Sequence, residues 1–339
     1  MCRFNSITYA DKEKFPVVSK RNPWYNTGGD FMIFTTTVSS VALLLMYAVP
    51  GFLLMKSKLV SKDSISAFAK VLLYVCQPCL TFYSFDKADF SPDLLGNLGI
   101  FFLVALIGQL GLLMLFYFIF RKRSTEDVRY RVYNTAMVLG NCGFFGIPVV
   151  ERLFPERSDA AVYCLVFTLA MNLLCWTLVL YIFTKDKKYI QAKRLLLNPS
   201  TLSFIAAFVL FVLSIKLPSL LSEAVSLGGK ISTPLCMTIL GMRLGTAAFK
   251  EIFCNLRQYA VILIKQMGVP LVIFALVYFL PVDEFIKQLS FILFCCPVAS
   301  NVLNYAELAG KGQETAGSCV LLGTILSIAT MPLMMLFLS

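Results

Sequence analysis

The sequence predicts an all-α polytopic membrane protein with ten transmembrane helices, arranged as two inverted five-helix repeats in which helices 4 and 9 are broken and cross. Three observations predict this fold. The 339 residues are 58% hydrophobic and only 14% charged, with a mean hydropathy of +0.77, which is too apolar for a soluble domain. Uncharged stretches recur at close to the roughly 20 residues that a spanning helix needs. Proline-broken segments also stand at matching places in the two halves.

Ten stretches have the length and hydropathy of membrane spans. They cover residues 31–54, 65–85, 94–120, 132–150, 160–184, 198–216, 221–242, 258–280, 285–306 and 315–338. The first five form one half, 31–184, and the last five form the other, 198–338, with a short basic linker at 185–197. Because five is odd, the second half enters the membrane from the opposite side, which makes the repeat inverted. Residues 1–30 are polar and have no apolar h-region, so we expect an N-terminal tail rather than a signal peptide.

Three pairs of polar or proline-containing sites correspond between the halves and support the repeat. Gln77-Pro78 in span 2 corresponds to Thr233-Pro234 in span 7, and Gln109 in span 3 to Lys265-Gln266 in span 8. The break from Gly143 to Pro148 in span 4 corresponds to the one from Pro297 to Asn301 in span 9. Proline removes a backbone donor and glycine loosens a helix, so each break frees peptide groups that hydrocarbon cannot satisfy. Breaks of this kind are tolerated where they line a cavity.

The net charge of +11 comes from 30 Lys and Arg against 19 Asp and Glu, and most of the excess lies in alternate loops. One set of loops is strongly basic and includes Lys56, Lys58, Lys62, Lys70, Arg121, Lys122, Arg123, Arg129, Arg131, Lys185, Lys187, Lys188, Lys193, Arg194, Arg243, Lys250, Arg257 and Lys311. The other set contains few basic residues. We expect the protein in the cytoplasmic membrane. The positive-inside rule then places the basic loops in the cytoplasm and both termini outside the cell. Only the basic N-terminal tail, residues 1–30, does not fit this orientation. This distribution argues against a nucleic-acid partner.

Residue types that carry metal or redox chemistry are missing or poorly placed. There is no histidine, and the eleven cysteines follow no metal-ligand spacing. Cys76 and Cys79 have the spacing of a redox motif but fall in the middle of a span, where packing is the simpler interpretation. No Asp or Glu lies deep in any span. We therefore expect no cofactor, no metal and no enzymatic activity.

Lys265 is the one charged residue that the sequence places well inside a span. It lies eight residues from Arg257, or about 12 Å along a helix. Three interpretations are open: partial snorkelling or a water-filled cavity, compensation of the negative C-terminal ends of broken half-helices, and direct attraction of an anionic substrate.

The two breaks fall near the midplane and predict a substrate site. If they cross, the half-helices that begin after Gly146 and Ala299 direct free N–H groups, equivalent to about half a positive charge each, at one point. Amides at Asn141 and Asn301 would add donors or acceptors. The candidate substrate-binding residues are Asn141, Gly143, Gly146, Pro148, Pro297, Ser300, Asn301, Lys265, Gln77 and Asn172. In the simpler alternative, the glycines permit close packing, the prolines are kinks and the amides form interhelical bonds.

At these residues the chain resembles the auxin efflux carrier family, which includes bacterial organic acid permeases and plant PIN-type carriers. The resemblance rests on Asn141-Cys-Gly-Phe-Phe-Gly-Ile-Pro148, on Pro234-Leu-Cys-Met-Thr-Ile-Leu-Gly-Met242, and on Pro297 to Asn301 followed by Tyr305-Ala306-Glu307. It implies the NhaA-like fold shared with bile acid sodium symporters, with a scaffold of spans 1, 2, 6 and 7 and a mobile core of spans 3–5 and 8–10. It also implies an elevator motion and pairing of two protomers. The long loop of the plant carriers is absent, which favours a compact bacterial type.

The sequence thus predicts a secondary carrier that moves an organic carboxylate, such as malate or an auxin-like acid, across the lipid bilayer. Na⁺ or H⁺ is a candidate coupling ion and a homodimer the expected assembly. Two alternatives remain: a sodium-coupled symporter of a larger amphipathic acid, which the lack of buried carboxylates disfavours, and a membrane receptor that binds without transport.

Overall fold

The fold is helical throughout the part of the chain that the computed structural model describes, residues 27–185, 198–247 and 252–338. The predictions for residues 1–26 and for most of the linker lie outside these ranges. The first half contains α1 (Thr27–Lys56), α2 (Ser64–Val71), η1 (Leu72–Cys76), α3 (Gln77–Lys87), α4 (Pro92–Phe120), α5 (Arg123–Glu126), α6 (Arg129–Val138), η2 (Cys142–Gly146), α7 (Ile147–Leu153), α8 (Ala160–Leu174), η3 (Cys175–Val179) and α9 (Leu180–Thr184). The second contains α11 (Pro199–Val212), α12 (Ser219–Thr246), α14 (Leu256–Leu263), η5 (Ile264–Gly268), α15 (Val269–Tyr278), α16 (Glu284–Cys295), α17 (Asn301–Ala309) and α18 (Gln313–Met335).

Within the described ranges, six continuous helices are long and apolar enough to cross a membrane: Phe31–Lys56, Ser64–Lys87, Pro92–Phe120, Ala160–Thr184, Leu256–Tyr278 and Gln313–Met335. They coincide with predicted spans 1, 2, 3, 5, 8 and 10. The other four predicted spans are helical as well, but they differ from a simple apolar rod. Spans 4 and 9 are each divided in two, and α11 has only 14 residues. Helix α12 is continuous, but charged and polar side chains such as Glu223 and Lys230 make it less apolar.

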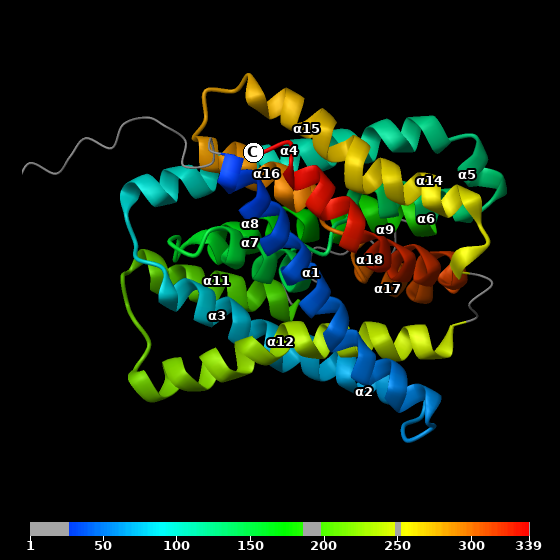
Figure 1. Cartoon of the computed structure of the whole chain (residues 1–339), viewed down its shortest axis with the longest axis horizontal. Coiled ribbons are helices and arrows are strands. Elements are labelled where there is room, and N and C mark those ends of the chain that lie inside the picture. The colour runs from blue at the N-terminus through cyan, green and yellow to red at the C-terminus, as the bar shows by residue number, and fades with distance from the viewer. Residues whose placement is uncertain (1–26, 186–197, 248–251, 339) are drawn as a thin grey trace, which may run out of the picture.

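The helices pack in two groups that meet along the length of the molecule (Figure 1). In the first group, α12 packs against α1 and α3, and α3 packs against α11. In the second group, α4 packs on α6 and α8, α15 on α16, and α18 on α14 and α17. Figure 1 shows α2, α3 and α12 along one edge and α14 and α15 along the opposite one, with the short broken helices between them. We call these the first and second helix groups.

Two glycines let α1 and α12 approach each other closely. A Cβ atom added to Gly241 would lie 1.8 Å from the carbonyl oxygen of Ala48, and one added to Gly51 would lie 1.9 Å from that of Thr238. No side chain fits at such distances, so the two backbones touch. Thr238 Oγ1 also donates to the carbonyl of Tyr47 across this contact (3.1 Å). The first helix group is thereby held together by backbone contact within the membrane.

A wide π turn precedes a proline in three helices. The turns η1, η2 and η5 end immediately before helices that carry Pro78, Pro148 and Pro270 in their first turn. Proline lacks an N–H and its ring crowds the carbonyl four residues earlier. The i→i+5 bonds of a π turn relieve this conflict without ending the helix, as when Ile147 N–H bonds to the carbonyl of Cys142. Proline therefore marks a local widening here rather than a break.

The actual interruption in span 4 lies at residues 139–141, before the segment from Gly143 to Pro148 that the sequence suggested. The prediction placed the break over Gly143 to Pro148, but the π turn η2 and helix α7 continue through this segment. Helix α6 ends at Val138, and the second half-helix begins at Cys142 instead of after Gly146. In span 9 the interruption at 296–300 agrees with the prediction, and α17 begins at Asn301.

The two interruptions cross as an antiparallel pair of extended segments. Gly140 and Val298 form an isolated antiparallel bridge. Asn141 N–H donates to the carbonyl of Pro297 (2.8 Å), and Ala299 N–H donates to that of Leu139 (3.0 Å). These bonds satisfy four of the backbone groups that the broken helices release, and they place the N-terminal ends of η2 and α17 beside each other.

Candidate functional site

A cavity of about 600 Å³ opens beside this crossing, and we call it the crossover pocket. It lies between the first helix group, through η1, α3 and the start of α11, and the second, through η2, α8 and α17. It is lined by Leu73, Tyr74, Gln77, Gly140, Asn141, Cys142, Gly143, Phe144, Thr168, Met171, Asn172, Trp176, Asn198, Pro199, Ser200, Ala299, Ser300, Asn301, Asn304, Tyr305 and Leu308. None of these residues is charged. The volume is in the range of small-molecule sites.

Backbone N–H groups at the two half-helix starts line this pocket without an acceptor. A helix leaves its first N–H groups unbonded. At η2 these belong to Gly143 and Phe144, and at α17 to Ser300 and Asn301; within the described part of the chain none of the four bonds to a backbone or side-chain oxygen. All four residues line the crossover pocket. The pocket wall therefore carries partial positive charge from two helix ends.

Asparagine side chains add further donors to the same wall. Asn141 is 6% exposed, and its Nδ2 is buried beside the Cys236 thiol without a hydrogen bond of good geometry in the described chain. The side-chain amides of Asn172, Asn301 and Asn304 also form no hydrogen bond within the described part of the chain, although each of these residues lines the pocket. For Asn141, a buried amide without a partner costs about 1 to 3 kcal/mol, whereas Asn301 and Asn304 are half-buried. The wall is thus prepared for a ligand that accepts several hydrogen bonds.

Six of the ten candidate residues line the crossover pocket. Asn141, Gly143, Ser300 and Asn301 surround the two half-helix starts, Asn172 lies on α8, and Gln77 lies on α3. Gln77 differs from the asparagines because its Nε2 donates to Ser200 Oγ (2.8 Å), which joins α3 to α11. Its amide group is therefore partly engaged in an interhelical bond.

The structure does not bring the other four candidates to the pocket wall. Gly146 faces α16, where an added Cβ would lie 3.0 Å from Leu293 Cδ2 and 3.2 Å from Cys296 Sγ. Close packing is therefore the role of this glycine. Pro148 lines a different cavity, beside α1 and α12. Pro297 contributes its carbonyl to the crossing through the bond from Asn141 N–H.

Lys265 is completely buried on η5, the one such charged residue among those described, and its ammonium group faces the last turn of α16. Its Nζ donates to the carbonyl oxygen of Phe294 at 2.8 Å. The last carbonyls of a helix carry the negative end of its dipole. This geometry agrees with compensation of a half-helix C-terminus and with neither snorkelling nor contact with a ligand in the crossover pocket.

Several pocket residues were not among the candidates from the sequence, although helical spacing points to them. Asn304 is three residues after Asn301 and so shares a face of α17, and Trp176 is four residues after Asn172 on the α8–η3 helix. Trp176 packs edge-on against Tyr305, with ring centroids 6.4 Å apart. Asn198 and Ser200 give no comparable signal, because only the packing of α11 on α3 brings them to the pocket.

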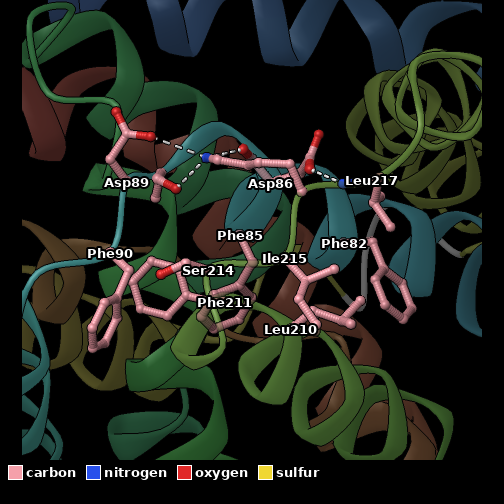
Figure 2. A pocket seen from close by; sticks show the side chains of 13 residues that line it. Phe82, Phe85, Asp86, Asp89, Phe90, Leu210, Phe211, Ser214, Ile215 and Leu217 are labelled. Atoms are coloured by element: carbon pink, nitrogen blue, oxygen red, sulfur yellow. Dashed lines mark hydrogen bonds and ion pairs between the residues drawn. The ribbon is translucent and has the colours of Figure 1, made fainter.

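A smaller cavity of about 200 Å³ lies where α3 and α11 end, and Figure 2 shows its charged rim over an aromatic floor. Lys216 Nζ donates to the carbonyls of Asp86 (2.7 Å) and Ala88 (2.8 Å) and pairs with Asp89 Oδ1 (3.1 Å). The Asp86 carboxylate accepts from Leu217 N–H (2.9 Å) and Ser222 Oγ (2.5 Å). All these groups are satisfied by one another, so the rim fastens the loop before α12 to the end of α3.

Comparison with known proteins gives the family. The family model described as "Membrane transport protein" matches residues 36–335, nearly all of the chain. The chain belongs to this family, that of the auxin efflux carriers. It is accordingly a multi-pass membrane transporter with a small-molecule substrate, as the sequence predicted. A search of curated proteins finds no match.

Proposed function

We propose that this transporter is a secondary carrier for an organic carboxylate, such as malate or an auxin-like acid, and that the carboxylate binds in the crossover pocket. The observation that carries the proposal is the set of unpaired donors there: four backbone N–H groups from two half-helix starts and the Nδ2 of Asn141. Carboxylate oxygens accept several hydrogen bonds at once and favour the positive end of a helix dipole.

The neutrality of the pocket also supports a carboxylate over a cation. A cationic substrate would need a carboxylate or a ring of carbonyls, and no Asp or Glu lines the pocket. An anion held by dipoles and amides alone is not locked in place by a strong ion pair, which suits a carrier that must release it on the other side. The apolar part of the wall, with Trp176, Met171 and Leu308, would receive the organic portion of the acid.

We infer that the chain crosses the membrane ten times as two inverted repeats. The packing supports this reading because matching pairs recur: α1 packs on α12 as α11 packs on α3, and α4 packs on α6 and α8 as α15 packs on α16 and α14 on α18. In this proposal the first helix group is the scaffold. The second group carries the crossing past it in an elevator motion, since the crossover pocket lies between the two groups.

Location and partners follow from the charge distribution and the family. We propose the cytoplasmic membrane, with the basic loops inside and both termini outside. The carrier would pair through the scaffold as a homodimer. Coupling to protons or sodium is part of the proposal. Because no carboxylate lines the crossover pocket, a sodium site in that pocket is disfavoured.

Flux measurements in liposomes test the function. The purified full chain is reconstituted, and uptake of radiolabelled malate and a panel of mono- and dicarboxylates is followed under sodium, proton and no gradients. We expect saturable carboxylate uptake and no uptake of choline, an organic cation. The double variant Asn141→Ala/Asn301→Ala is the matched control, because it removes donors without changing charge. Absence of flux for every carboxylate under every gradient would refute the proposal.

A thermal-shift screen separates a carrier from a receptor. A carboxylate that binds the native state raises the melting temperature in proportion to the logarithm of its concentration. Stabilisation by an acid that shows no flux in liposomes would replace the carrier with a non-transporting receptor. Flux that depends steeply on sodium would instead favour the sodium-coupled symporter.

A further inference from the structure

A further cavity, of about 260 Å³, lies between the first helix group and α7. Its wall combines α1, α3 and α12 with the half-helix that follows η2, and it is lined by Ser40, Leu43, Leu44, Tyr47, Leu80, Tyr83, Ile147, Pro148, Glu151, Arg152, Gly229, Lys230, Thr233 and Pro234. We call it the second vestibule. Like the crossover pocket, it is bounded by both helix groups.

The two cavities are neighbours along one broken helix. The crossover pocket is lined by η2 as far as Phe144, and the second vestibule by the same helix from Ile147 onward, about 5 Å further along. Between them, Thr233 Oγ1 donates to the carbonyl of Phe144 at 3.1 Å. Thr233 lines the vestibule and Phe144 lines the pocket. The hydrogen bond between these two residues therefore lies between the two cavities.

Charge distinguishes the second vestibule from the neutral crossover pocket. Arg152, in the last turn of α7, is exposed and has no ion-pair or hydrogen-bond partner within the described residues. Lys230 is also exposed; its Nζ lies 5.6 Å from the centroid of the Tyr83 ring and forms no ion pair with any described residue. The one carboxylate in the lining, Glu151, is paired with Lys87 at 3.5 Å. The vestibule thus carries two uncompensated positive charges.

The charges stand on the side of the molecule opposite to the basic loops. Arg152 precedes the α7–α8 loop, and Lys230 lies in the first half of α12, whereas Arg243 near the other end of α12 pairs with Glu307 on α17. In the orientation proposed above, the vestibule is the extracytoplasmic face. Cations there work against the positive-inside bias, so insertion of the protein gives no reason for them.

We propose that the second vestibule is an anion-concentrating site at the outer end of the substrate pathway, where Arg152 and Lys230 hold an organic carboxylate before it reaches the crossover pocket. The proposal rests on the proposed function for the identity of the anion, but the attraction of anions is a property of the vestibule itself. A cleft lined by one sign of charge raises the local concentration of the opposite ion, and added salt weakens the effect.

The first test measures the potential of the vestibule without any substrate. Leu43→Cys introduces a thiol into its lining, and intact cells are treated with membrane-impermeant methanethiosulfonates that carry either a sulfonate or a trimethylammonium group. Modification of the parent chain is subtracted because it has native cysteines. We expect the anionic reagent to react preferentially, and the ratio of the two rates to fall about tenfold in the Arg152→Gln/Lys230→Gln background.

Lys287→Gln is the matched control. Lys287, on α16, pairs with Glu284 and does not line the vestibule, so its loss changes the net charge of the same face without entering the site. The rate ratio should stay unchanged in this variant. If Lys287→Gln lowers the rate ratio as much as the double variant does, the preference for the anionic reagent comes from the general surface potential, and the proposal fails. An unchanged rate ratio in the double variant would also overturn the proposal.

The second test links the vestibule to transport. Malate uptake is compared in right-side-out and inside-out vesicles. Neutralising both cations should raise the KM about fivefold in right-side-out vesicles at low salt and leave it unchanged in inside-out vesicles. Arg152→Lys should retain the wild-type KM. A change in both orientations would overturn an outer entry role. If no carboxylate is transported at all, the proposed function fails, while the thiol test still decides whether the vestibule attracts anions.

Discussion

The two ends of the crossing half-helices differ in how their backbone groups are satisfied. At the acceptor end, where α16 finishes, the carbonyl of Phe294 accepts from Lys265 Nζ (2.8 Å), and that of Leu293 accepts from Cys142 Sγ (3.3 Å). At the donor end, where η2 and α17 begin, the N–H groups of Gly143, Phe144, Ser300 and Asn301 have no acceptor in the described chain, and these residues line an open cavity. The interrupted helices therefore have satisfied carbonyl groups at one end and unsatisfied N–H groups at the other.

This difference indicates which groups belong to the protein and which to a ligand. A buried lysine is costly in a membrane, and its cost is offset when it neutralises a helix end that would otherwise be unsatisfied. Nothing comparable neutralises the donor end. The acceptor end is therefore a structural solution, whereas in the function proposed above the donor end is the site that the substrate anion completes. Five substitutions, with Lys265→Gln as a control, test this distinction in order of decreasing expected effect.

Lys265→Met should have the largest effect, and on stability. The change keeps the length of the side chain but leaves the Phe294 carbonyl without its charged donor, which corresponds to about 1.5 to 3 kcal/mol. We expect a clearly lower melting temperature of the purified protein. Substrate affinity of the fraction that remains folded should be unchanged, and Lys265→Gln, which retains a donor, should recover part of the loss. A stable Lys265→Met protein with weakened substrate binding would place the lysine at the ligand instead.

Asn141→Ala and Asn301→Ala should act in the opposite way, on binding rather than on stability. Each removes an amide from the donor end, and a hydrogen bond to a charged group contributes about 1.5 to 3 kcal/mol, so we expect carboxylate affinity to fall about tenfold or more. The melting temperature of the empty protein should stay the same or rise for Asn141→Ala, since its Nδ2 has no partner to lose. Wild-type affinity in both variants would remove the crossover pocket as the substrate site.

Asn304→Ala should have a smaller effect of the same kind. Asn304 lines the pocket one turn beyond the start of α17, about 5 Å from the free N–H groups. A neutral hydrogen bond at that distance from the donor end corresponds to a loss of affinity of about threefold. Titration of the thermal shift with the carboxylate measures it. A loss as large as that of Asn301→Ala would move the centre of the site away from the helix ends.

Thr233→Val should have the smallest effect. It removes the bond to the Phe144 carbonyl that joins the two helix groups between the cavities, at a cost of about 1 kcal/mol or less. We expect a slight decrease in melting temperature and an altered rate of malate exchange in liposomes with unchanged affinity. A destabilisation as great as that of Lys265→Met would show that this contact belongs to the core rather than to the boundary between the groups.

Much of the fold could be predicted from the sequence because the membrane restricts the choices. Long apolar stretches must be helices in hydrocarbon, so each predicted span coincides with a helix or a pair of helices. The crossing of the two interruptions, at Asn141 and at Pro297 to Asn301, could also be predicted. Helix breaks at matching places in the two halves of a membrane protein have few functions other than forming a shared site. The position of the first break was not, because a π turn before Pro148 shifted it to residues 139–141.

The sequence by itself determined the class of protein, the two interrupted helices and the presence of one intramembrane cation, because hydropathy, proline and charge act locally. Only the tertiary structure decided that Lys265 faces the acceptor end and that the free N–H groups and asparagine amides face a shared cavity. Those facts depend on the rotation of each helix about its axis and on which helices lie side by side. Both are set by packing between segments far apart in the chain, which no local pattern records.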